Sequence, residues 1–398
     1  MPLLATARNL RRVALLALSL AAWCALTPSR AAAQSEFYVA SQRELAGAPG
    51  TIIRQERMGD APLGASAYRI LYRSVGMHGE PIAVSGVIIV PAGPAPEHGR
   101  PVVAWAHPTS GVAPRCAPSL ALFLFRQIQG LRLMLERGYV VAATDYPGLG
   151  TPGPHPYLVG TSEAHAVIDS VRAARGLTQA GAGRDFVVWG HSQGGHAALF
   201  TGILTHTYAP DLRLLGVAAA APATDLAALL TDDFNTDGGR SLTAMTLWSW
   251  SRVYGASLDA VLAPAAVANV NIIASECVES LFDLIEHRVA ARPLRKRFLT
   301  VENITQVQPW RHLLAVNTPG PLPQSTPLFL AQGTNDNLVV PAVTEAYRQR
   351  QCAAGSRVQF FSMPGVGHGF AARDSAGAAV EWMAGRFAHQ PAPDNCSR

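Results

Sequence analysis

The segment from residue 185 to residue 204 most constrains the fold, because it joins a short apolar run, a tight glycine turn and an apolar segment of helix length. The apolar run ends in Gly190-His-Ser192-Gln-Gly194. Strand, sharp turn and helix in this order form the setting in which a G-x-S-x-G pattern presents a nucleophilic serine. Glycines two residues before and after the serine let neighbouring backbones approach closely. We therefore predict that Ser192 is a nucleophile and that the Gln193 N–H is free at a helix N-terminus. A chance match in a chain with 35 glycines is the alternative.

The first 33 residues are predicted to be a secretory signal peptide. Three arginines precede an apolar run over residues 13–26, and alanines at 31–33 offer a cleavage site. This run is too short and too close to the N-terminus to be a membrane span, and we expect no transmembrane segment. The Arg11-Arg12 pair leaves twin-arginine export open beside the general secretory route. Removal of the four arginines of this segment lowers the formal net charge from +5 to +1, so charge gives no case for nucleic-acid binding.

From residue 100 onward, predicted strands and helices alternate, which is typical of a mostly parallel sheet covered by helices. Upstream, apolar and charged residues alternate with period two, and residues 67–90 are predicted to form an antiparallel pair with a turn at 77–80. The predicted strands are 101–106, 139–144, 186–189, 214–221, 328–332 and 358–362. Helices are expected over 120–137, around 164–171, over 341–354 and over 373–387.

Residues 223–318 interrupt this alternation, because they are rich in helix formers and contain no clear strand. About ninety residues is far beyond the usual length of a connection. We therefore predict a helical cap inserted into an α/β core, with residues 34–222 forming the first part of the core and residues 319–398 the last part. A pair of long crossover helices is the alternative.

A serine hydroxyl is a weak nucleophile at neutral pH, so it needs a base, and the base needs an acid to orient it. After a nucleophile turn of this kind, the acid precedes the histidine in the chain. The strand at 328–332 runs into a turn that carries Asp336, and the strand at 358–362 runs into a glycine-flanked loop with His368. Both lie at carboxyl ends of strands, where α/β sheets place their sites. We assign Ser192 as nucleophile, His368 as general base and then acid, and Asp336 as the orienting acid.

Four other residues compete for these roles. His191 adjoins the serine, so its side chain should point away from the tip of the turn. Asp145 precedes the serine, which is the wrong chain order, and its surroundings predict a structured loop. His196 lies on the helix and is expected to be a packing or surface residue. Asn335 cannot supply the negative charge that stabilises an imidazolium.

An oxyanion hole requires two hydrogen-bond donors. The Gln193 N–H is one, and the second should come from the loop after the strand at 101–106, which reads His107-Pro-Thr-Ser-Gly111. Pro108 has no N–H, so we choose the N–H of Thr109, with its hydroxyl as an additional donor. A plain turn is the alternative. We recognise no phosphate-binding loop, dinucleotide fingerprint or Cys/His cluster in the sequence, and we expect no cofactor and no bound metal.

Five cysteines are present, and Cys24 lies within the predicted signal peptide. The other four are Cys116, Cys277, Cys352 and Cys396. An even number in an exported chain suggests two disulfides, for which three connectivities exist. Buried free thiols are the alternative.

Five motifs together resemble the secretory lipase family over roughly residues 37–398. They are Trp105-Ala-His107-Pro-Thr109-Ser-Gly111, Asp145-Tyr-Pro-Gly-Leu-Gly150, Gly190-His-Ser192-Gln-Gly-Gly195, Gly333-Thr-Asn-Asp336 and Gly367-His368-Gly369. The resemblance implies an α/β-hydrolase fold with a lid over an acyl-binding tunnel, and hydrolysis of acylglycerols or simpler carboxylic esters. It also implies the disulfides Cys116–Cys277 and Cys352–Cys396. His107-Pro108 departs from the usual local sequence of the family. A composition rich in Ala, Gly, Pro and Arg and poor in Lys suggests a bacterial member.

The sequence therefore predicts a secreted or periplasmic serine hydrolase, a lipase or esterase that forms an acyl-enzyme on Ser192. A serine peptidase of the prolyl-oligopeptidase type shares the triad order, but those enzymes usually carry a large β domain before the core, and too few residues precede Pro101. A non-catalytic binding protein on the same scaffold is the third reading. The expected partner is a small-molecule or lipid ester, with lipid-surface contact through the cap as an added hypothesis. We expect a monomer that binds no nucleic acid.

Overall fold

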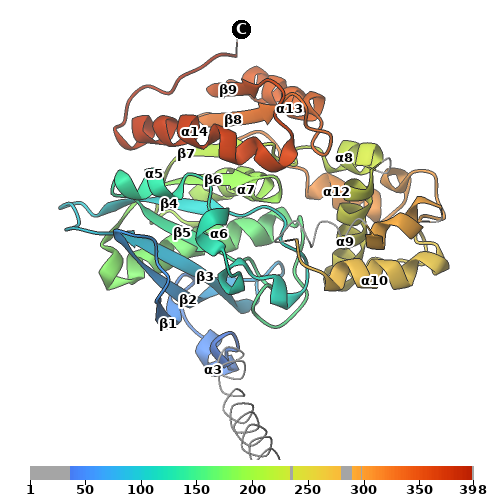
Figure 1. Cartoon of the computed structure of the whole chain (residues 1–398), viewed down its shortest axis with the longest axis horizontal. Coiled ribbons are helices and arrows are strands. Elements are labelled where there is room, and N and C mark those ends of the chain that lie inside the picture. Colours follow the sequence, from blue (N-terminus) through green and yellow to red (C-terminus); the bar gives the residue numbers. More distant parts are fainter. Residues whose placement is uncertain (1–35, 234–235, 279–288, 297, 397–398) are drawn as a thin grey trace, which may run out of the picture.

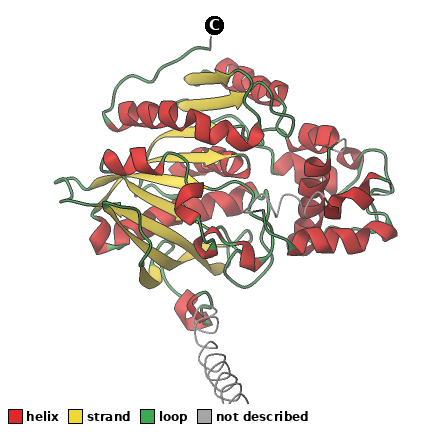
Figure 2. Ribbon diagram, in the orientation of Figure 1, coloured by secondary structure: helices red, strands yellow, loops and turns green. Residues whose placement is uncertain are grey.

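The computed structural model describes residues 36–233, 236–278, 289–296 and 298–396. The predicted signal peptide, residues 1–33, lies outside the described residues. One twisted sheet occupies the centre of the molecule, helices cover both of its faces, and a group of helices lies at one side (Figures 1 and 2).

The sheet of the described residues has nine strands in the order β1-β2-β3-β5-β4-β6-β7-β8-β9. The first three strands form an antiparallel meander, β3 pairs antiparallel with β5, and every pair from β5 to β9 is parallel. The bounds are β1 (Ile52–Met58), β2 (Ala65–Val75), β3 (Pro81–Pro91), β4 (Arg100–Ala106), β5 (Val140–Thr144), β6 (Ala182–His191), β7 (Arg213–Ala220), β8 (Leu328–Gly333) and β9 (Val358–Met363). The mostly parallel sheet predicted from the alternation of elements is confirmed.

Helices cover the sheet on two faces because the buried strands are apolar on both sides. Alternate residues of β4 and β6 divide between two clusters of buried side chains, with Val103 and Val187 in one and Val102 and Val188 in the other. Helices α6 (Gly160–Gly176) and α7 (Gln193–Tyr208) pack on one face, and α5 (Leu131–Glu136) and α14 (Ala371–Phe387) pack on the other. Helix α13 (Pro341–Ala353) contacts β8 and β9, and the short α3 (Gln42–Leu45) precedes the sheet.

Two local predictions differ from the structure. The single helix expected over residues 120–137 is wrong, because the chain forms the short turn η2 (Pro118–Leu120), then α4 (Leu124–Gln127), then α5. Gly130 separates the last two at φ +81°, a conformation that only glycine adopts readily. Strand β1 was not predicted, because it lies at the sheet edge with its side chains half-buried or exposed and shows no apolar alternation.

Between β7 and β8 the chain leaves the sheet and forms a group of helices, drawn in yellow to orange at the right of Figure 1. They are α8 (Leu226–Asp233), α9 (Asp237–Val253), α10 (Val267–Ser275) and α12 (Trp310–Val316), with the short turns η4 (Pro264–Ala266), η5 (Arg292–Arg295) and η6 (Ile304–Gln306) between them. The rings of Trp250 on α9 and Trp310 on α12 stack at 6.3 Å and are buried. An aromatic pair of this kind holds two helices together through both apolar burial and ring stacking.

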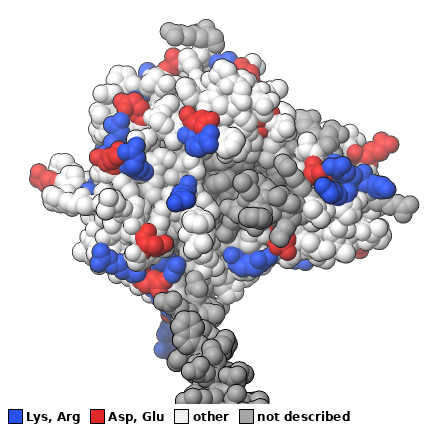
Figure 3. All heavy atoms as spheres, in the orientation of Figure 1, with Lys and Arg blue, Asp and Glu red and all other residues white. Residues whose placement is uncertain are grey.

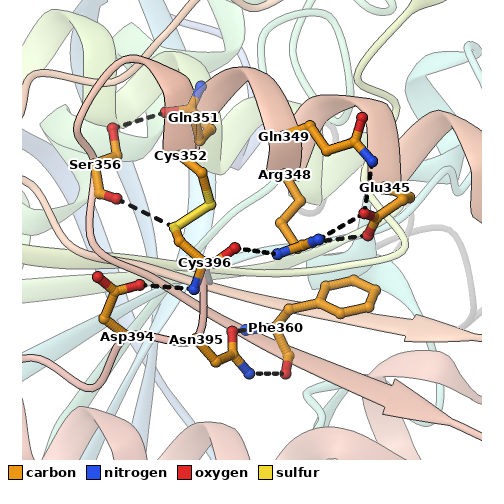
Figure 4. Close-up of a disulfide and its surroundings, with 10 residues drawn as sticks. All are labelled: Glu345, Arg348, Gln349, Gln351, Cys352, Ser356, Phe360, Asp394, Asn395 and Cys396. Carbon is orange, nitrogen blue, oxygen red and sulfur yellow. Dashed lines mark hydrogen bonds and ion pairs between the residues drawn. A yellow bond between two sulfur atoms is a disulfide. The ribbon is translucent and has the colours of Figure 1, made fainter. Parts of the chain in front are cut away.

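Both disulfides implied by the resemblance are present. Cys116, in the turn η1 (Pro114–Cys116) beyond β4, bonds to Cys277, which follows α10. Cys352 on α13 bonds to Cys396 near the C-terminus. Figure 4 shows how the tail lies beside β9, where the Asn395 side chain makes bonds of 2.8 and 2.9 Å to the backbone of Phe360.

The double variant Cys352→Ala/Cys396→Ala should fold but be less stable. The bond closes a loop with a sequence separation of 44 residues, so the chain-entropy model assigns it about 4 kcal/mol of unfolding free energy. Urea unfolding of the variant and the parent protein measures this difference. An unchanged urea midpoint would contradict a stabilising role for this bond.

Candidate active site

Ser192 lies in the turn that joins β6 to α7, with φ 57° and ψ −117°. This is a strained conformation for a residue that is not glycine. Glycines on either side are required by space: a Cβ on Gly190 would lie 2.0 Å from the Gly194 carbonyl oxygen, and one on Gly194 would lie 1.9 Å from the Ala106 carbonyl oxygen. The turn therefore presses the first residues of α7 against the ends of β4 and β6.

The three side chains assigned to a catalytic triad form one row of hydrogen bonds. His368 Nε2 lies 2.8 Å from Ser192 Oγ, and His368 Nδ1 lies 2.8 Å from Asp336 Oδ2. Ser192 follows β6, Asp336 follows β8 and His368 begins the turn η7 (His368–Phe370) after β9. Because these strands are parallel, their carboxyl ends meet at one edge of the sheet, where the chain brings the three residues together.

The Asp336 carboxylate is held from several sides. Its Oδ1 accepts the backbone N–H groups of Leu338 and Val339, both at 2.9 Å, and its Oδ2 accepts from the Gln332 side chain at 3.2 Å. Burial alone would raise the pKa of Asp336, but the hydrogen bond and charge of His368, aided by the two backbone donors, outweigh it and hold the pKa below its ordinary value. Asp336 is therefore a charged acceptor suited to orienting His368.

His191 packs against His368. Its Nε2 donates to the His368 backbone carbonyl at 3.0 Å. The two imidazole rings lie 5.0 Å apart. Burial, with a smaller contribution from His368, lowers the pKa of His191 to about 3. His191 is therefore a neutral donor that supports the loop carrying His368.

The two residues chosen for the oxyanion hole lie at the ends of neighbouring strands. Gln193 is the first residue of α7, where backbone N–H groups have no partner within the helix. Thr109 follows β4, which is held against the start of α7 by the contact between Gly194 and Ala106. The Thr109 hydroxyl lies 2.8 Å from the Tyr157 hydroxyl, so its side chain is already engaged and the backbone N–H remains the candidate donor.

Sequence reasoning missed a buried polar network around the Gln193 side chain. Glu163 on α6, which is fully buried, accepts from Gln193 Nε2 at 2.8 Å and lies 2.7 Å from His196 Nδ1. His155 Nε2 lies 3.1 Å from the same Gln193 nitrogen. His196, expected to be a packing or surface residue, is thus part of a polar core. The sequence shows Glu163 beside the apolar stripe of a predicted helix. This position alone does not identify the residues that bond to the glutamate.

Asp145 takes no part in the row of hydrogen bonds from Ser192 through His368 to Asp336. Its carboxylate accepts from Ser85 Oγ at 2.6 Å and from the Ser119 backbone N–H at 2.8 Å. Burial raises the pKa of Asp145 despite these bonds. The residue therefore ties the loop after β5 to β3 and to η2, as expected for a structured loop.

In the described part of the chain no group of three or more His, Cys, Asp or Glu side chains is arranged to hold a metal ion.

The variant His191→Asn should reduce the acid sensitivity of the fold. A histidine with a pKa of 6.5 when unfolded and about 3 when folded stays neutral in the folded protein while the unfolded chain takes up a proton. The contribution of His191 to the free energy of unfolding is therefore complete above about pH 6.5 and is lost as the pH falls toward about 3. Between pH 7 and pH 5 the loss is about 2 kcal/mol.

Urea unfolding of the parent and of His191→Asn at the two pH values tests this expectation. The difference in unfolding free energy between the proteins should shrink by about 2 kcal/mol at pH 5. Other buried groups titrate in both proteins and cancel in this comparison. Equal losses in the two proteins would contradict the neutral, buried state of His191.

Comparisons with solved structures identify the class of this fold. The structure matches that of Candida antarctica lipase A in its closed state with a TM-score of 0.76 at 18% identity, covering 91% of this chain and 87% of that one. It matches the rice cell wall degrading esterase LipA of Xanthomonas oryzae with a TM-score of 0.67 at 21% identity, covering 87% of this chain and 100% of that one. These likenesses show an α/β-hydrolase fold.

Sequence relatives agree with this fold. A probable inactive lipase of Mycobacterium tuberculosis is 25% identical over 87% of this chain and 80% of its own length. Lipase 6 of Candida albicans is 25% identical over 92% of this chain and 83% of its own length. The sequence profile named Secretory lipase matches residues 126–395, and the two disulfides fit an oxidising compartment. The chain therefore belongs to the secretory lipase family, as a hydrolase of the lipase and esterase type that is secreted or periplasmic.

Proposed function

We propose that this chain hydrolyses carboxylic esters through an acyl-enzyme on Ser192, with acylglycerols or related acyl esters as substrates. The observation that carries the proposal is the continuous row from Ser192 Oγ through His368 to Asp336, with both contacts at 2.8 Å. A base within 2.6–3.2 Å of a nucleophile and an acid behind that base form the arrangement that acyl transfer requires.

The reaction proceeds in two halves. The Ser192 hydroxyl attacks the ester carbonyl carbon while its proton passes to His368 Nε2, and His368 then gives that proton to the departing alkoxide. Water attacks the acyl-enzyme in the second half, with His368 again acting as base and then as acid. Asp336 stays ionised throughout and stabilises the imidazolium through the bond to Nδ1.

Negative charge on the former carbonyl oxygen is met by backbone donors. We assign the N–H of Gln193 and the N–H of Thr109 to this role. The start of α7 adds the positive end of the helix dipole at the same place. Preorganised donors of this kind stabilise the tetrahedral intermediate more than the bound ester, so they raise kcat rather than ground-state binding.

The name of the Mycobacterium tuberculosis relative shows that family membership alone does not decide activity. The intact row at Ser192 favours an active enzyme over a non-catalytic binding protein. Assays with p-nitrophenyl esters and with peptide anilides distinguish the three functions. Hydrolysis of esters alone supports the proposal, and hydrolysis of anilides favours a peptidase of the prolyl-oligopeptidase type. Hydrolysis of neither substrate indicates a non-catalytic binding protein.

The variant Ser192→Ala should lose ester hydrolysis by a factor approaching ~10⁶ in kcat, as for removal of other triad serines. A fluorescent alkyl phosphonate should label the parent protein once per chain and leave the variant unlabelled. Circular dichroism provides the control for folding. Retention of more than about a hundredth of the activity by clean, folded variant protein would remove Ser192 from the mechanism, since triad serines contribute far more than that.

We further propose that residues 223–318 are a cap that covers Ser192 and binds the acyl chain. The segment begins beside the nucleophile, where the Ala223 N–H donates to the Ser192 carbonyl at 3.5 Å. Near its other end, the Asn317 carbonyl accepts from His196 Nε2 at 2.7 Å. Ser192 is only 9% exposed, which supports a cap seated over the site.

The wider surface suits a neutral ester better than a polyanion. On the face drawn in Figure 3, acidic and basic side chains are interspersed among the described residues, most of which are uncharged there. Val267 and Ile272 on α10 are 40% and 48% exposed, which supports lipid-surface contact through the cap as a further part of the proposal. In the described residues no helix is long and apolar enough to cross a membrane.

Exchanging the cap for that of a relative with another acyl preference should change the chain-length profile. Each buried substrate CH₂ contributes about 0.8 kcal/mol, so kcat/KM should rise up to about fourfold per CH₂ until the acyl site is full. The measurement is kcat/KM on a series from acetyl to palmitoyl esters, with phosphonate titration of Ser192 to count active sites. An unchanged profile in a chimaera whose Ser192 still titrates would show that the cap does not choose the substrate.

A further inference from the structure

We propose that cap helix α9 completes the oxyanion hole, with Ser249 and Trp250 as positioning residues for both proposed donors. One short segment, residues 155–157, links α9 to the two donors. Helix α9 hydrogen-bonds to the backbone of this segment, and the side chains of the segment contact Gln193 and Thr109. This inference rests on the proposed function, because the donors matter only if Ser192 carries out acyl transfer.

Ser249 and Trp250 hold the backbone of residues 155–157 with three hydrogen bonds. The Ser249 hydroxyl donates to the His155 carbonyl at 2.6 Å and accepts the Tyr157 N–H at 3.0 Å. The Trp250 indole N–H donates to the Tyr157 carbonyl at 2.8 Å. Ser249 and Trp250 are fully buried, so water does not replace these bonds, and the segment is fixed to α9 over its whole length.

The same segment reaches both proposed donors through its side chains. His155 Nδ1 lies 2.8 Å from the Pro147 carbonyl, so this nitrogen carries the proton and Nε2 is an acceptor. Gln193 Nε2 therefore donates to His155 Nε2 at 3.1 Å. Burial lowers the pKa of His155 to about 4, which keeps this acceptor neutral at pH 7. On the other side, the Tyr157 hydroxyl meets the Thr109 hydroxyl at 2.8 Å.

The opposite side of Gln193 is held by Glu163. The second amide hydrogen of Gln193 goes to Glu163 Oε1 at 2.8 Å, so the two acceptors determine which way the amide faces. The Gln193 Oε1 atom is buried with no hydrogen-bond partner in the described part of the chain, and no third bond compensates if either acceptor moves. The Gln193 side chain, and with it the first backbone N–H of α7, is thus positioned between the core and the segment that α9 holds.

The cap also grips the loop that carries Thr109. The Val278 N–H donates to the Ser110 carbonyl at 2.8 Å, next to a bridge between Gly111 and Cys277. The disulfide from Cys277 to Cys116 closes this contact covalently. The cap therefore contacts the backbone of Ser110 and Gly111, which follow Thr109, and Tyr157 contacts the Thr109 side chain. Both donors depend on cap residues, so the oxyanion hole is complete when α9 is seated on the core. Coupling of closure to site assembly in this way is a known route to specificity.

The test compares Ser249→Ala with Ser251→Ala. Ser251 lies on the same helix, but its hydroxyl donates to the Trp248 carbonyl within α9, so it is the matched control. We expect Ser249→Ala to lower kcat on p-nitrophenyl acetate by roughly tenfold to a hundredfold, somewhat less than the loss of a whole oxyanion donor. KM should change by less than about twofold, and Ser251→Ala should behave as the parent protein.

Two further measurements distinguish positioning from general damage. A trifluoromethyl ketone forms an oxyanion adduct with the serine, so its affinity should fall by the same factor as kcat/KM in Ser249→Ala. Phosphonate labelling should remain at one per chain, which shows that Ser192 and His368 are intact. Trp250→Phe is the second variant and replaces Ser249→Ala in the test if that protein does not fold. It keeps an aromatic ring but removes the indole donor, so we expect a smaller loss of kcat with KM unchanged.

The outcomes separate this inference from the function on which it rests. An unlabelled, inactive parent protein would overturn the proposed function itself. A labelled, active parent with parent-like kcat in Ser249→Ala and in Trp250→Phe would overturn the role of α9 alone. A loss that appears in KM with kcat retained would also overturn it, because α9 would then act on substrate binding and not on the oxyanion.

Discussion

The backbone of Ser192, held at φ 57° and ψ −117°, is the constraint on which the rest of the site depends. A single strained residue costs on the order of 1–3 kcal/mol and persists only where its surroundings determine it. Here β6 enters the turn from a fully buried stretch, and α7 leaves it with Gly194 against the Ala106 carbonyl. A side chain at Gly190 or Gly194 would push α7 off the sheet, which would move Ser192 and the Gln193 N–H together.

The same parallel sheet explains how much of the site was predictable from sequence. Buried parallel strands are continuous apolar runs that end in recognisable turns, so the positions of Ser192, Asp336 and His368 after their strands could be read locally. Their meeting at one edge follows from strand direction alone. Prediction was wrong where local pattern and tertiary packing differ, as at Gly130, whose left-handed conformation against α14 divides a segment of helical composition.

The polar network behind Gln193 could not be predicted in this way. Its bonds join residues far apart in the chain, with separations of 92 to 94 residues between Ser249 or Trp250 and residues 155–157, and 121 between His196 and Asn317. A buried serine or glutamate in an otherwise apolar helix face has no periodic signature, and its partner is defined only once the cap is docked. Local patterns therefore identify the candidate triad but not the buried side chains that surround Gln193.

Apolar contacts and buried hydrogen bonds have different effects on how the proposed cap packs on the core. Buried apolar side chains of the core and of α9, such as Leu158 and Trp250, share one hydrophobic cluster. They contribute much of the attraction, but they tolerate small shifts because dispersion and burial are not directional. The buried hydrogen bonds of Ser249, Trp250 and Asn317 tolerate no such shift, since each bond lost leaves an unsatisfied group at a cost of about 1–3 kcal/mol. The proposed cap is thereby restricted to one register on the core, and in that register residues 155–157 contact both Gln193 and Thr109. A helical insertion joined to the same core by apolar contacts alone would cover Ser192 without fixing the two proposed oxyanion donors.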